Sequence, residues 1–276
     1  MNIDVKEKKQ NKNKLFLIII IIAVLTAIYT YNYYNKPKPQ EEVLEEQKPQ
    51  QEQPQIEEEP VEEGPQYEEI LTIIEGQQAY ISVPTKIDEN NPPVLVIYSH
   101  GSNTSVTDNM NDPFMKDMQE YGVLFASHNY IFSASNQHGV NWGNSASIQD
   151  MINLKEWIEE RYSIQPKINL IGFSMGGLPT LNFATQYPNI VGKIALLAPS
   201  IKSAEWNNTR AQKLKDIQIK LWHGNKDVNV PYSSSVSFVK KLQGYGITID
   251  FVTVEDKGHF DIDTEYMQDI LEFFST

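Results

Sequence analysis

The sequence predicts an α/β domain over residues 70–276, with a mostly parallel sheet and helices on both faces. Short apolar runs alternate with helix-like segments along this region, and Val94–Tyr98 is apolar without interruption. Strands that alternate with helices form parallel sheets, because a helix must return the chain to the starting edge. Strands covered on both faces read as continuous apolar runs. A region of this length is expected to form a single catalytic domain.

The first half of the domain is predicted to begin with a hairpin. Ile70–Ile74 and Ala79–Val83 pair through the turn Glu75-Gly76, and Val94–Tyr98 follows as a buried strand. Asp112 and Pro113 have the chemistry of a helix cap and a first helical position, and Gly122 is expected to end that helix. The next predicted elements are a strand and a helix, Val123–Ser127 and Ser147–Arg161.

The second half continues the alternation. Lys167–Ile171 is a predicted strand, and the helix after it runs to about Tyr187. Residues 201–216 form a short excursion with irregular helix. The remaining predicted elements are two strands and a helix before the last strand and helix: Ile194–Ala198, Ile217–Trp222, Ser233–Leu242, Ile247–Val254 and Thr264–Phe274. In such sheets, functional sites form at the carboxyl ends of the strands.

Three segments of different composition precede the domain. Residues 1–14 are a basic tail, expected to be cytoplasmic, and residues 15–34 lack charge over a length of about 30 Å, which spans a bilayer core. Lysines before this apolar segment and tyrosines at its end predict a signal anchor with the domain outside the cell. A cleaved secretory signal is the alternative, but the sequence around Thr26 and Ala27 is a poor cleavage site. Residues 35–69, rich in Pro, Gln and Glu, are expected to form a disordered stalk.

Composition excludes several kinds of site. The chain has no cysteine, so disulfides, thiolate metal sites and a cysteine nucleophile are all impossible. The net charge is −13, and the predicted domain shares the excess of acidic side chains. An acidic surface repels the phosphate backbone, so nucleic acid is an unsuitable ligand. No metal site and no cofactor are predicted, and small-molecule or peptide substrates remain open.

A short glycine-rich motif supplies the strongest chemical signal. The motif follows a predicted strand and precedes a predicted helix, and it reads Gly172-Phe173-Ser174-Met175-Gly176-Gly177. A G-x-S-x-G sequence between a strand and a helix makes a sharp turn that exposes the serine Oγ above the sheet. Ser174 is therefore the candidate nucleophile.

A serine nucleophile needs a base and an acid. His259 lies between the last strand and the last helix, and Asp227 follows the strand that ends at Trp222. Histidine takes the serine proton, and a carboxylate orients the imidazole. Glu255 and Asp256 are rival acids, although neighbours in sequence seldom point correctly at an imidazole. The catalytic prediction is Ser174, Asp227 and His259.

The same reasoning predicts an oxyanion hole and contacts with the substrate. The N–H groups of Met175 and Ser102 are the expected donors, with Asn103 as the alternative to Ser102. His100 is expected to shape this hole through a hydrogen bond and to lie at the substrate-binding site. Trp142, in a loop rich in aromatic residues, is expected to hold an acyl group or a sugar ring, unless it only packs that loop.

These motifs resemble the α/β-hydrolase superfamily of serine hydrolases, in its esterase and prolyl-oligopeptidase-like group. The resemblance covers residues 70–276 and rests on Ser99-His100-Gly101, the Ser174 motif, His223-Gly224-Asn225-Lys226-Asp227 with Val230-Pro231, and Gly258-His259. It implies the α/β-hydrolase fold, an acyl-enzyme mechanism and no cofactor. Residues 201–216 are too few for a large lid, which argues against a lipase.

The expected protein is a membrane-anchored, extracytoplasmic serine hydrolase acting on carboxylic esters. Two alternatives stay open. The first alternative is a peptidase or amidase that uses the same residues, because a serine triad does not indicate which leaving group it releases. A non-catalytic binding module that keeps the fold is the second.

Overall fold

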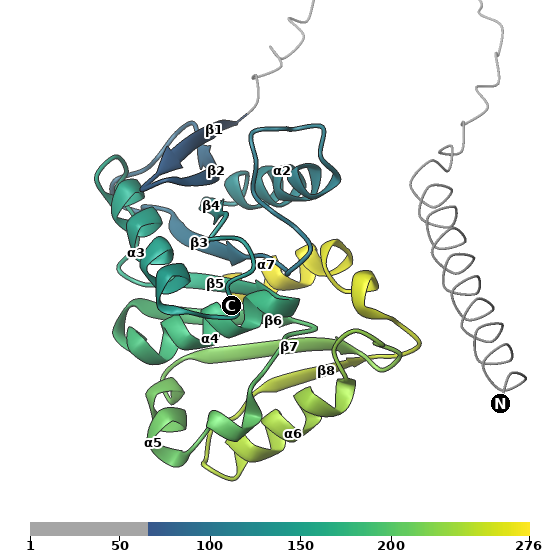
Figure 1. The fold of residues 1–276 in the computed structure, drawn as a ribbon. Helices are drawn as coiled ribbons and strands as arrows, with labels where there is room; N and C mark the ends of the chain where they lie inside the picture. The colour runs from purple at the N-terminus through teal and green to yellow at the C-terminus, as the bar shows by residue number, and fades with distance from the viewer. Residues whose placement is uncertain (1–65) are drawn as a thin grey trace, which may run out of the picture. The chain divides into compact units, whose positions relative to one another are not determined.

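The computed structural model describes residues 66–276, which form an eight-stranded sheet between two layers of helices (Figure 1). The strands lie in the order β1-β2-β4-β3-β5-β6-β7-β8, and neighbours from β4 to β8 are parallel. The β1–β2 and β2–β4 pairs are antiparallel. The strands β1 to β8 are Tyr67–Ile74, Gln77–Pro84, Val94–Ser99, Tyr130–Ser135, Ile168–Phe173, Val191–Leu197, Gln218–Gly224 and Asp250–Val254. The predicted mostly parallel α/β fold is confirmed.

Each face of the sheet carries its own apolar core. Met115, Phe125 and Phe274 join one core from α2 and α7, whereas Leu154 and Phe183 join the other from α3 and α4. Side chains of a strand alternate between the two faces, so each central strand contributes to both cores. The helices α2 to α7 are Pro113–Ala126, Ser145–Glu159, Gly177–Gln186, Asn208–Ala211, Tyr232–Gln243 and Met267–Ser275.

The register of the parallel strands aligns their carboxyl ends at one edge. Ser99 at the end of β3 is level with Gly172 near the end of β5, and Gly224 at the end of β7 is level with Val254 at the end of β8. The loops after these four strands therefore leave the sheet on the same side. These are the loops that contain every residue of the predicted catalytic set.

The prediction that Gly122 ends a helix is wrong. Gly122 lies inside α2, which continues to Ala126, and the segment expected as a strand at 123–127 is the last part of that helix. A Cβ at Gly122 would lie 2.4 Å from Tyr80 Oη and 2.8 Å from Ser82 Cβ. Glycine is thus needed at this position because α2 packs closely on β2. From the sequence alone, a glycine that allows such packing cannot be distinguished from a glycine that ends a helix.

This error moves the next strand. The strand β4 begins at Tyr130, so Tyr130 and Phe132 belong to the core rather than to a loop beside the site. Phe132 stacks on Tyr121 of α2 at 5.4 Å between ring centroids. Trp142, by contrast, lies in the loop between β4 and α3 and is exposed.

The domain also begins earlier than predicted. Residues 67–69, assigned to the stalk on composition, are the start of β1. Glu69 accepts a hydrogen bond from Tyr80 Oη at 2.6 Å and from Gln119 Nε2 at 2.9 Å. These acidic residues belong to the sheet because they pair with β2, a contact that composition alone does not predict.

The predicted cytoplasmic tail, signal anchor and nearly all of the predicted stalk lie outside the described residues. Within residues 66–276, no helix combines the length and the apolar character that crossing a membrane requires. The anchor at residues 15–34 therefore stays a prediction.

Candidate active site

Ser174 occupies a strained turn between β5 and α4. Its φ is 52°, in the left-handed region that residues other than glycine rarely adopt. A Cβ at Gly172 would lie 2.6 Å from Thr180 Oγ1, and one at Gly176 would lie 1.9 Å from the carbonyl oxygen of Ser99. The two glycines thus allow the close packing that holds Ser174 in this conformation. Strain of this kind concentrates at functional sites.

Ser174, His259 and Asp227 form one continuous hydrogen-bonded chain. His259 Nε2 lies 2.9 Å from Ser174 Oγ, and His259 Nδ1 lies 2.7 Å from Asp227 Oδ2. A carboxylate only accepts, so Nδ1 carries the proton and Nε2 presents its lone pair to the serine hydroxyl. This is the tautomer that a general base requires. The structure brings together all three residues of the predicted catalytic set.

The Asp227 carboxylate is fully buried and held by donors on both oxygens. Its Oδ1 accepts from the backbone N–H groups of Asn229 and Val230, both at 2.8 Å. Burial alone would raise the pKa of Asp227, but hydrogen bonds from His223, His259 and the Val230 N–H outweigh it. Together they hold the pKa of this carboxyl well below its usual range, so Asp227 is ionised at neutral pH.

A second histidine contacts the same carboxylate oxygen. His223 Nε2 lies 3.1 Å from Asp227 Oδ2 and 3.0 Å from the carbonyl oxygen of Val230. Two acceptors face Nε2, so this nitrogen carries the proton, and Nδ1 accepts from Ser235 Oγ at 2.7 Å. His223 thus joins the Asp227 carboxylate to the backbone of the loop that follows it.

The rival acids do not reach His259. Glu255 accepts a hydrogen bond from Asn225 Nδ2, and Asp256 is exposed with Lys226 Nζ 3.9 Å from its carboxylate. The loops that carry Asp227 and His259 are joined by backbone instead: Lys226 N–H donates to the carbonyl oxygen of Lys257 at 3.0 Å. A Cβ at Gly224 would lie 2.2 Å from that same oxygen, so the two loops can pack this closely only with glycine there.

The loop after β3 runs against the Ser174 turn. The contact between Gly176 and Ser99 brings the predicted oxyanion donors, Ser102 and Met175, to the same edge of the sheet. Met175 is fully buried. Their role toward a substrate stays a prediction, because it depends on where a reacting oxygen would sit.

His100 is a structural link in this loop. Its Nδ1 lies 2.7 Å from the carbonyl oxygen of Gly101, and its Nε2 lies 2.9 Å from that of Asn136, in the loop after β4. The residue is 1% exposed. This burial favours shaping of the oxyanion loop over the predicted contact with a substrate.

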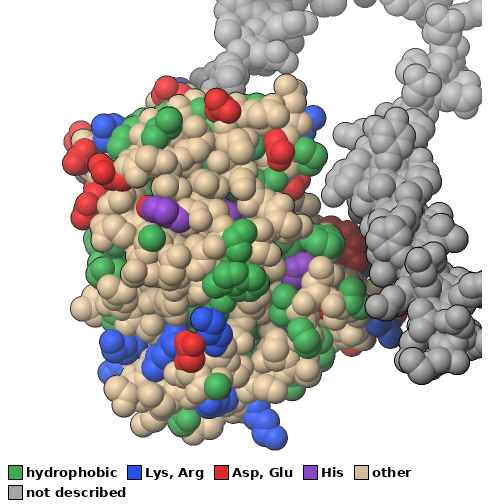
Figure 2. Space-filling view, in the orientation of Figure 1, with side chains coloured by type: hydrophobic (Ala, Val, Ile, Leu, Met, Phe, Trp, Pro, Cys, Tyr) green, Lys and Arg blue, Asp and Glu red, His purple; other side chains and the backbone are tan. Residues whose placement is uncertain are grey.

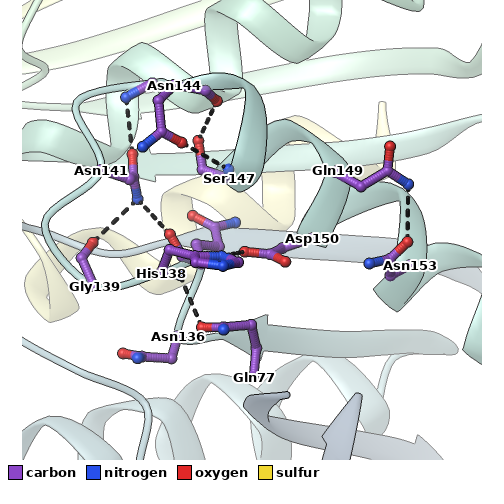
Figure 3. Close-up of polar contacts among 12 residues, drawn as sticks. Gln77, Asn136, His138, Gly139, Asn141, Asn144, Ser147, Gln149, Asp150 and Asn153 are labelled. Carbon is purple, nitrogen blue, oxygen red and sulfur yellow. Dashed lines mark hydrogen bonds and ion pairs between the residues drawn. The ribbon is translucent and has the colours of Figure 1, made fainter. Parts of the chain in front are cut away.

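The loop between β4 and α3 is a second strained segment, pinned by polar contacts (Figure 3). His138 Nδ1 lies 2.6 Å from the buried carboxylate of Asp150, and the His138 N–H donates to Gln77 Oε1 at 2.9 Å. Asn141 Nδ2 donates to the carbonyl oxygen of Gly139 at 3.2 Å. The positive-φ residues of this loop are Gln137, His138, Gly139, Trp142 and Gly143.

Trp142 is the exposed aromatic residue of this hydrogen-bonded loop. It combines a left-handed φ of 48° with a side chain that is half exposed, at 50%. The predicted contact of Trp142 with a substrate stays a prediction.

One buried cluster near the site had no signal in the sequence. Tyr98 of β3 donates to the Asp263 carboxylate at 2.8 Å, and Tyr121 of α2 donates to the same carboxylate at 3.3 Å. Asp263 follows His259 by four residues, so this cluster ties the histidine loop to β3 and α2. Burial raises the pKa of Asp263 to about 7, and the nearby Asp117 carboxylate adds to the rise.

The sequence profile of the phospholipase/carboxylesterase family matches residues 76–276. The chain belongs to this family. Membership places it among the serine hydrolases of the α/β-hydrolase fold, as its motifs predicted, and the matched region contains the whole hydrogen-bonded chain around Ser174.

Solved structures of hydrolases share the fold. A thermostable esterase superposes with a TM-score of 0.56 at 18% identity, covering 75% of this chain and 62% of its own. The feruloyl esterase module of Clostridium thermocellum gives 0.60 at 14% identity, covering 74% and 86%. At such identities the likeness concerns the fold alone.

Curated sequences match over a shorter segment. The homoserine O-acetyltransferase of Corynebacterium glutamicum is 37% identical over 68 residues, which is 24% of this chain and 18% of the relative. A second homoserine O-acetyltransferase, from Sulfurimonas autotrophica, is 37% identical over 60 residues, covering 22% of this chain and 16% of the relative. The chain thus spans less than a fifth of the length of either curated relative.

Proposed function

We propose that this protein is a membrane-anchored, extracytoplasmic serine hydrolase that cleaves carboxylic esters through an acyl-enzyme intermediate. The observation that carries the proposal is the hydrogen-bonded chain from Ser174 through His259 to Asp227. Ser174 attacks, His259 moves the proton, and Asp227 orients the imidazole and stabilises its cation. The family to which the chain belongs supports ester cleavage.

The reaction uses each of these groups twice. Ser174 Oγ bonds to the carbonyl carbon of the ester while its proton passes to His259 Nε2. The C–O bond to the alcohol then breaks, and the leaving oxygen takes the proton from Nε2. Water then attacks the acyl carbon while its proton passes to His259 Nε2, the bond to Ser174 Oγ breaks, and Oγ takes that proton as the carboxylic acid leaves. The N–H groups of Ser102 and Met175 stabilise the negative oxygen of both tetrahedral intermediates.

Ester hydrolysis by purified residues 66–276 tests the proposal. We expect hydrolysis of p-nitrophenyl acetate by this fragment and a loss of several orders of magnitude in kcat for Ser174→Ala. Ser233→Ala, which removes an exposed hydroxyl on α6, is the matched control and should retain full activity. An active Ser174→Ala protein would contradict the assignment of the nucleophile.

A substrate panel separates ester from amide cleavage. Short acyl esters and aminoacyl amides are compared by kcat/KM on the same preparation. Activity restricted to amides would replace the esterase proposal with a peptidase or amidase. Inactivity on both classes would favour the non-catalytic binding module.

The proposed location rests on the composition of residues 1–34. The basic tail stays in the cytoplasm, residues 15–34 span the membrane, and residues 35–66 hold the catalytic domain away from its surface. Protease added to intact cells expressing the full chain is expected to digest the domain. Protection of the domain in intact cells would contradict this orientation.

A further inference from the structure

A cavity of about 630 Å³ lies beside helix α4. It opens between the start of α3, the outer half of α4 and the excursion around α5. Most of its lining side chains carry amides or hydroxyls, namely Ser145, Asn182, Thr185, Gln186, Asn207 and Thr209. Figure 2 shows basic side chains gathered around one acidic group on the same face of the molecule.

Arg210 forms a rigid wall of this cavity. Its guanidinium stacks on the Trp206 ring at 4.3 Å, and its Nη2 donates to Asn182 Oδ1 at 2.6 Å. Glu205 is its acidic partner, with Arg210 Nη1 3.3 Å from Glu205 Oε2, and Lys202 Nζ lies 3.8 Å from the other oxygen of the same carboxylate. Asn182 in turn donates to the carbonyl oxygen of Gly143 at 2.7 Å, so the cavity is built on a fixed network. The result is a preformed surface of planar hydrogen-bonding groups, and Lys213 adds a cation to its lining.

The cavity is connected to the Ser174 region through the strained loop before α3. Gly143 lines the cavity, and a Cβ on it would lie 2.9 Å from Leu178 Cβ in the first turn after the Ser174 motif. Asn182 follows Ser174 by eight residues on the adjoining helix, a rise of about 12 Å. Trp142, half exposed and in a left-handed conformation, immediately precedes Gly143. A substrate that extends from Ser174 past Trp142 would reach the cavity.

These features match the chemistry of a carbohydrate. Planar amide and guanidinium groups hydrogen-bond neighbouring hydroxyls in pairs, and an exposed indole ring packs on the C–H face of a sugar. Arg210 is paired with Glu205, so Lys213 is the lining cation that an anionic ligand would use, and a phosphate-bearing ester tests that alternative. The strain at Trp142 is maintained by the surrounding hydrogen bonds although the ring stays in solvent, as expected of a binding residue.

We propose that the cavity between α3, α4 and α5 binds the glycan part of an acylated oligosaccharide, with Trp142 packing on the sugar nearest the ester. This inference rests on the proposed serine hydrolase function and names its substrate class. Ser174 would attack the acyl carbonyl, and the sugar hydroxyl would leave with the proton from His259. Water would then hydrolyse the acyl-enzyme, so the products are a de-esterified glycan and a carboxylic acid.

Kinetics on substrates with one acyl group and different alcohols test the proposal. The substrates are O-acetylated xylotetraose, p-nitrophenyl acetate and 1-acetylglycerol 3-phosphate. Trp142→Asn, which suits the left-handed backbone, should lower kcat/KM on the xylotetraose ester about tenfold and leave that on p-nitrophenyl acetate within about twofold. Gln186→Leu at the far end of the cavity should show the same selective loss. The matched controls, Val140→Asn in the same loop and Gln149→Leu on the exposed side of α3, should change neither value.

Binding without catalysis separates this inference from the proposed function. Calorimetry with the Ser174→Ala protein and unmodified xylotetraose is expected to detect binding that Trp142→Asn weakens about tenfold. Absence of binding would overturn the cavity assignment even if p-nitrophenyl acetate is cleaved. A preference for the phosphate-bearing ester, or equal losses on all substrates, would also overturn it. Sugar binding by a protein that cleaves no ester would retain the cavity and reject the hydrolase.

Discussion

Asp227 is the residue on which the chemistry of the site depends most sensitively. Its Oδ2 accepts from His259, which contacts Ser174, and from His223, which does not. The contact with His259 fixes the tautomer of the proposed base, and the contact with His223 fixes the position of the carboxylate. Both histidines were visible in the sequence, but only the fold shows that they share one oxygen.

Replacing Asp227 by asparagine tests the tautomer. The Asn amide can donate to His259 Nδ1, which moves the proton to Nε2 and removes the lone pair that faces Ser174. We expect Asp227→Asn to lower kcat by about 10⁴-fold with the fold intact. Steady-state kinetics and circular dichroism measure the two effects. Asp256→Asn, at the exposed rival acid, should keep normal kcat.

His223 is expected to act as a positioning residue. His223→Ala leaves Asp227 with His259 and two backbone donors, so kcat should fall only about tenfold, with KM unchanged. Removing buried hydrogen bonds should also cost about 1–3 kcal/mol of unfolding free energy. Denaturant titration and kinetics separate the two losses. A kcat equal to that of the wild type would show that His223 only fills space.

At the scale of elements, the strands and helices around Ser174 were predictable and the α2–β4 region was not. The motif at 172–177 needs glycines for contacts that any Cβ would block, so its local structure can be predicted from its sequence. Gly122 is needed for an equally close contact with β2, but nothing nearby in sequence distinguishes it from a helix stop. The predicted catalytic residues survived this error because they follow β3, β5, β7 and β8. Asp263 escaped prediction because its partners, Tyr98 and Tyr121, are distant in sequence.

Gly122→Ala tests the packing explanation. The added Cβ meets Tyr80 Oη and Ser82 Cβ at 2.4 and 2.8 Å, so the helix must shift away from β2. We expect a loss of about 1–3 kcal/mol in the free energy of unfolding, although alanine favours helix. Gly244→Ala, at the end of α6 where no outside atom is closer than 3.3 Å, is the control. Equal stability of the two variants would refute the close contact.

At the scale of the whole domain, the Asp263 cluster joins the His259 loop to both β3 and α2. The groups that face its carboxylate are the hydroxyls of Tyr98 and Tyr121 and the Asp117 carboxylate, whose own pKa burial raises to about 6. The described residues place no cation in hydrogen-bonding contact with Asp263. The fold therefore favours the protonated acid at this position.

This pKa gives stability a definite dependence on pH. The pKa of Asp263 in the folded protein, about 7, lies above the ordinary value of 3.8. The stability that the protonated Asp263 gives to the fold is therefore fully present below about pH 4 and is lost as the pH rises to 7. The difference between the two pKa values limits the loss to about 4 kcal/mol. Asp227, with a lowered pKa, contributes in the opposite sense and only in stronger acid.

Asp263→Asn should flatten this dependence. The amide oxygen still accepts from Tyr98, and no charge appears as pH rises, so unfolding free energy should decline less between pH 4 and 7 than in the wild type. Denaturant unfolding at several pH values measures both slopes, and Asp269→Asn on the exposed side of α7 is the control. Equal slopes for Asp263→Asn and the wild type would contradict the buried-acid explanation.

The most direct test of the central claim is covalent labelling of Ser174 by a fluorophosphonate probe, located by peptide mass spectrometry. We expect one label, on the peptide that contains Ser174, and much slower labelling of the His259→Ala protein because the base is gone. Absence of labelling would contradict the assignment of Ser174 as the nucleophile. So would a label on another serine that forms equally fast in the wild type and in the His259→Ala protein.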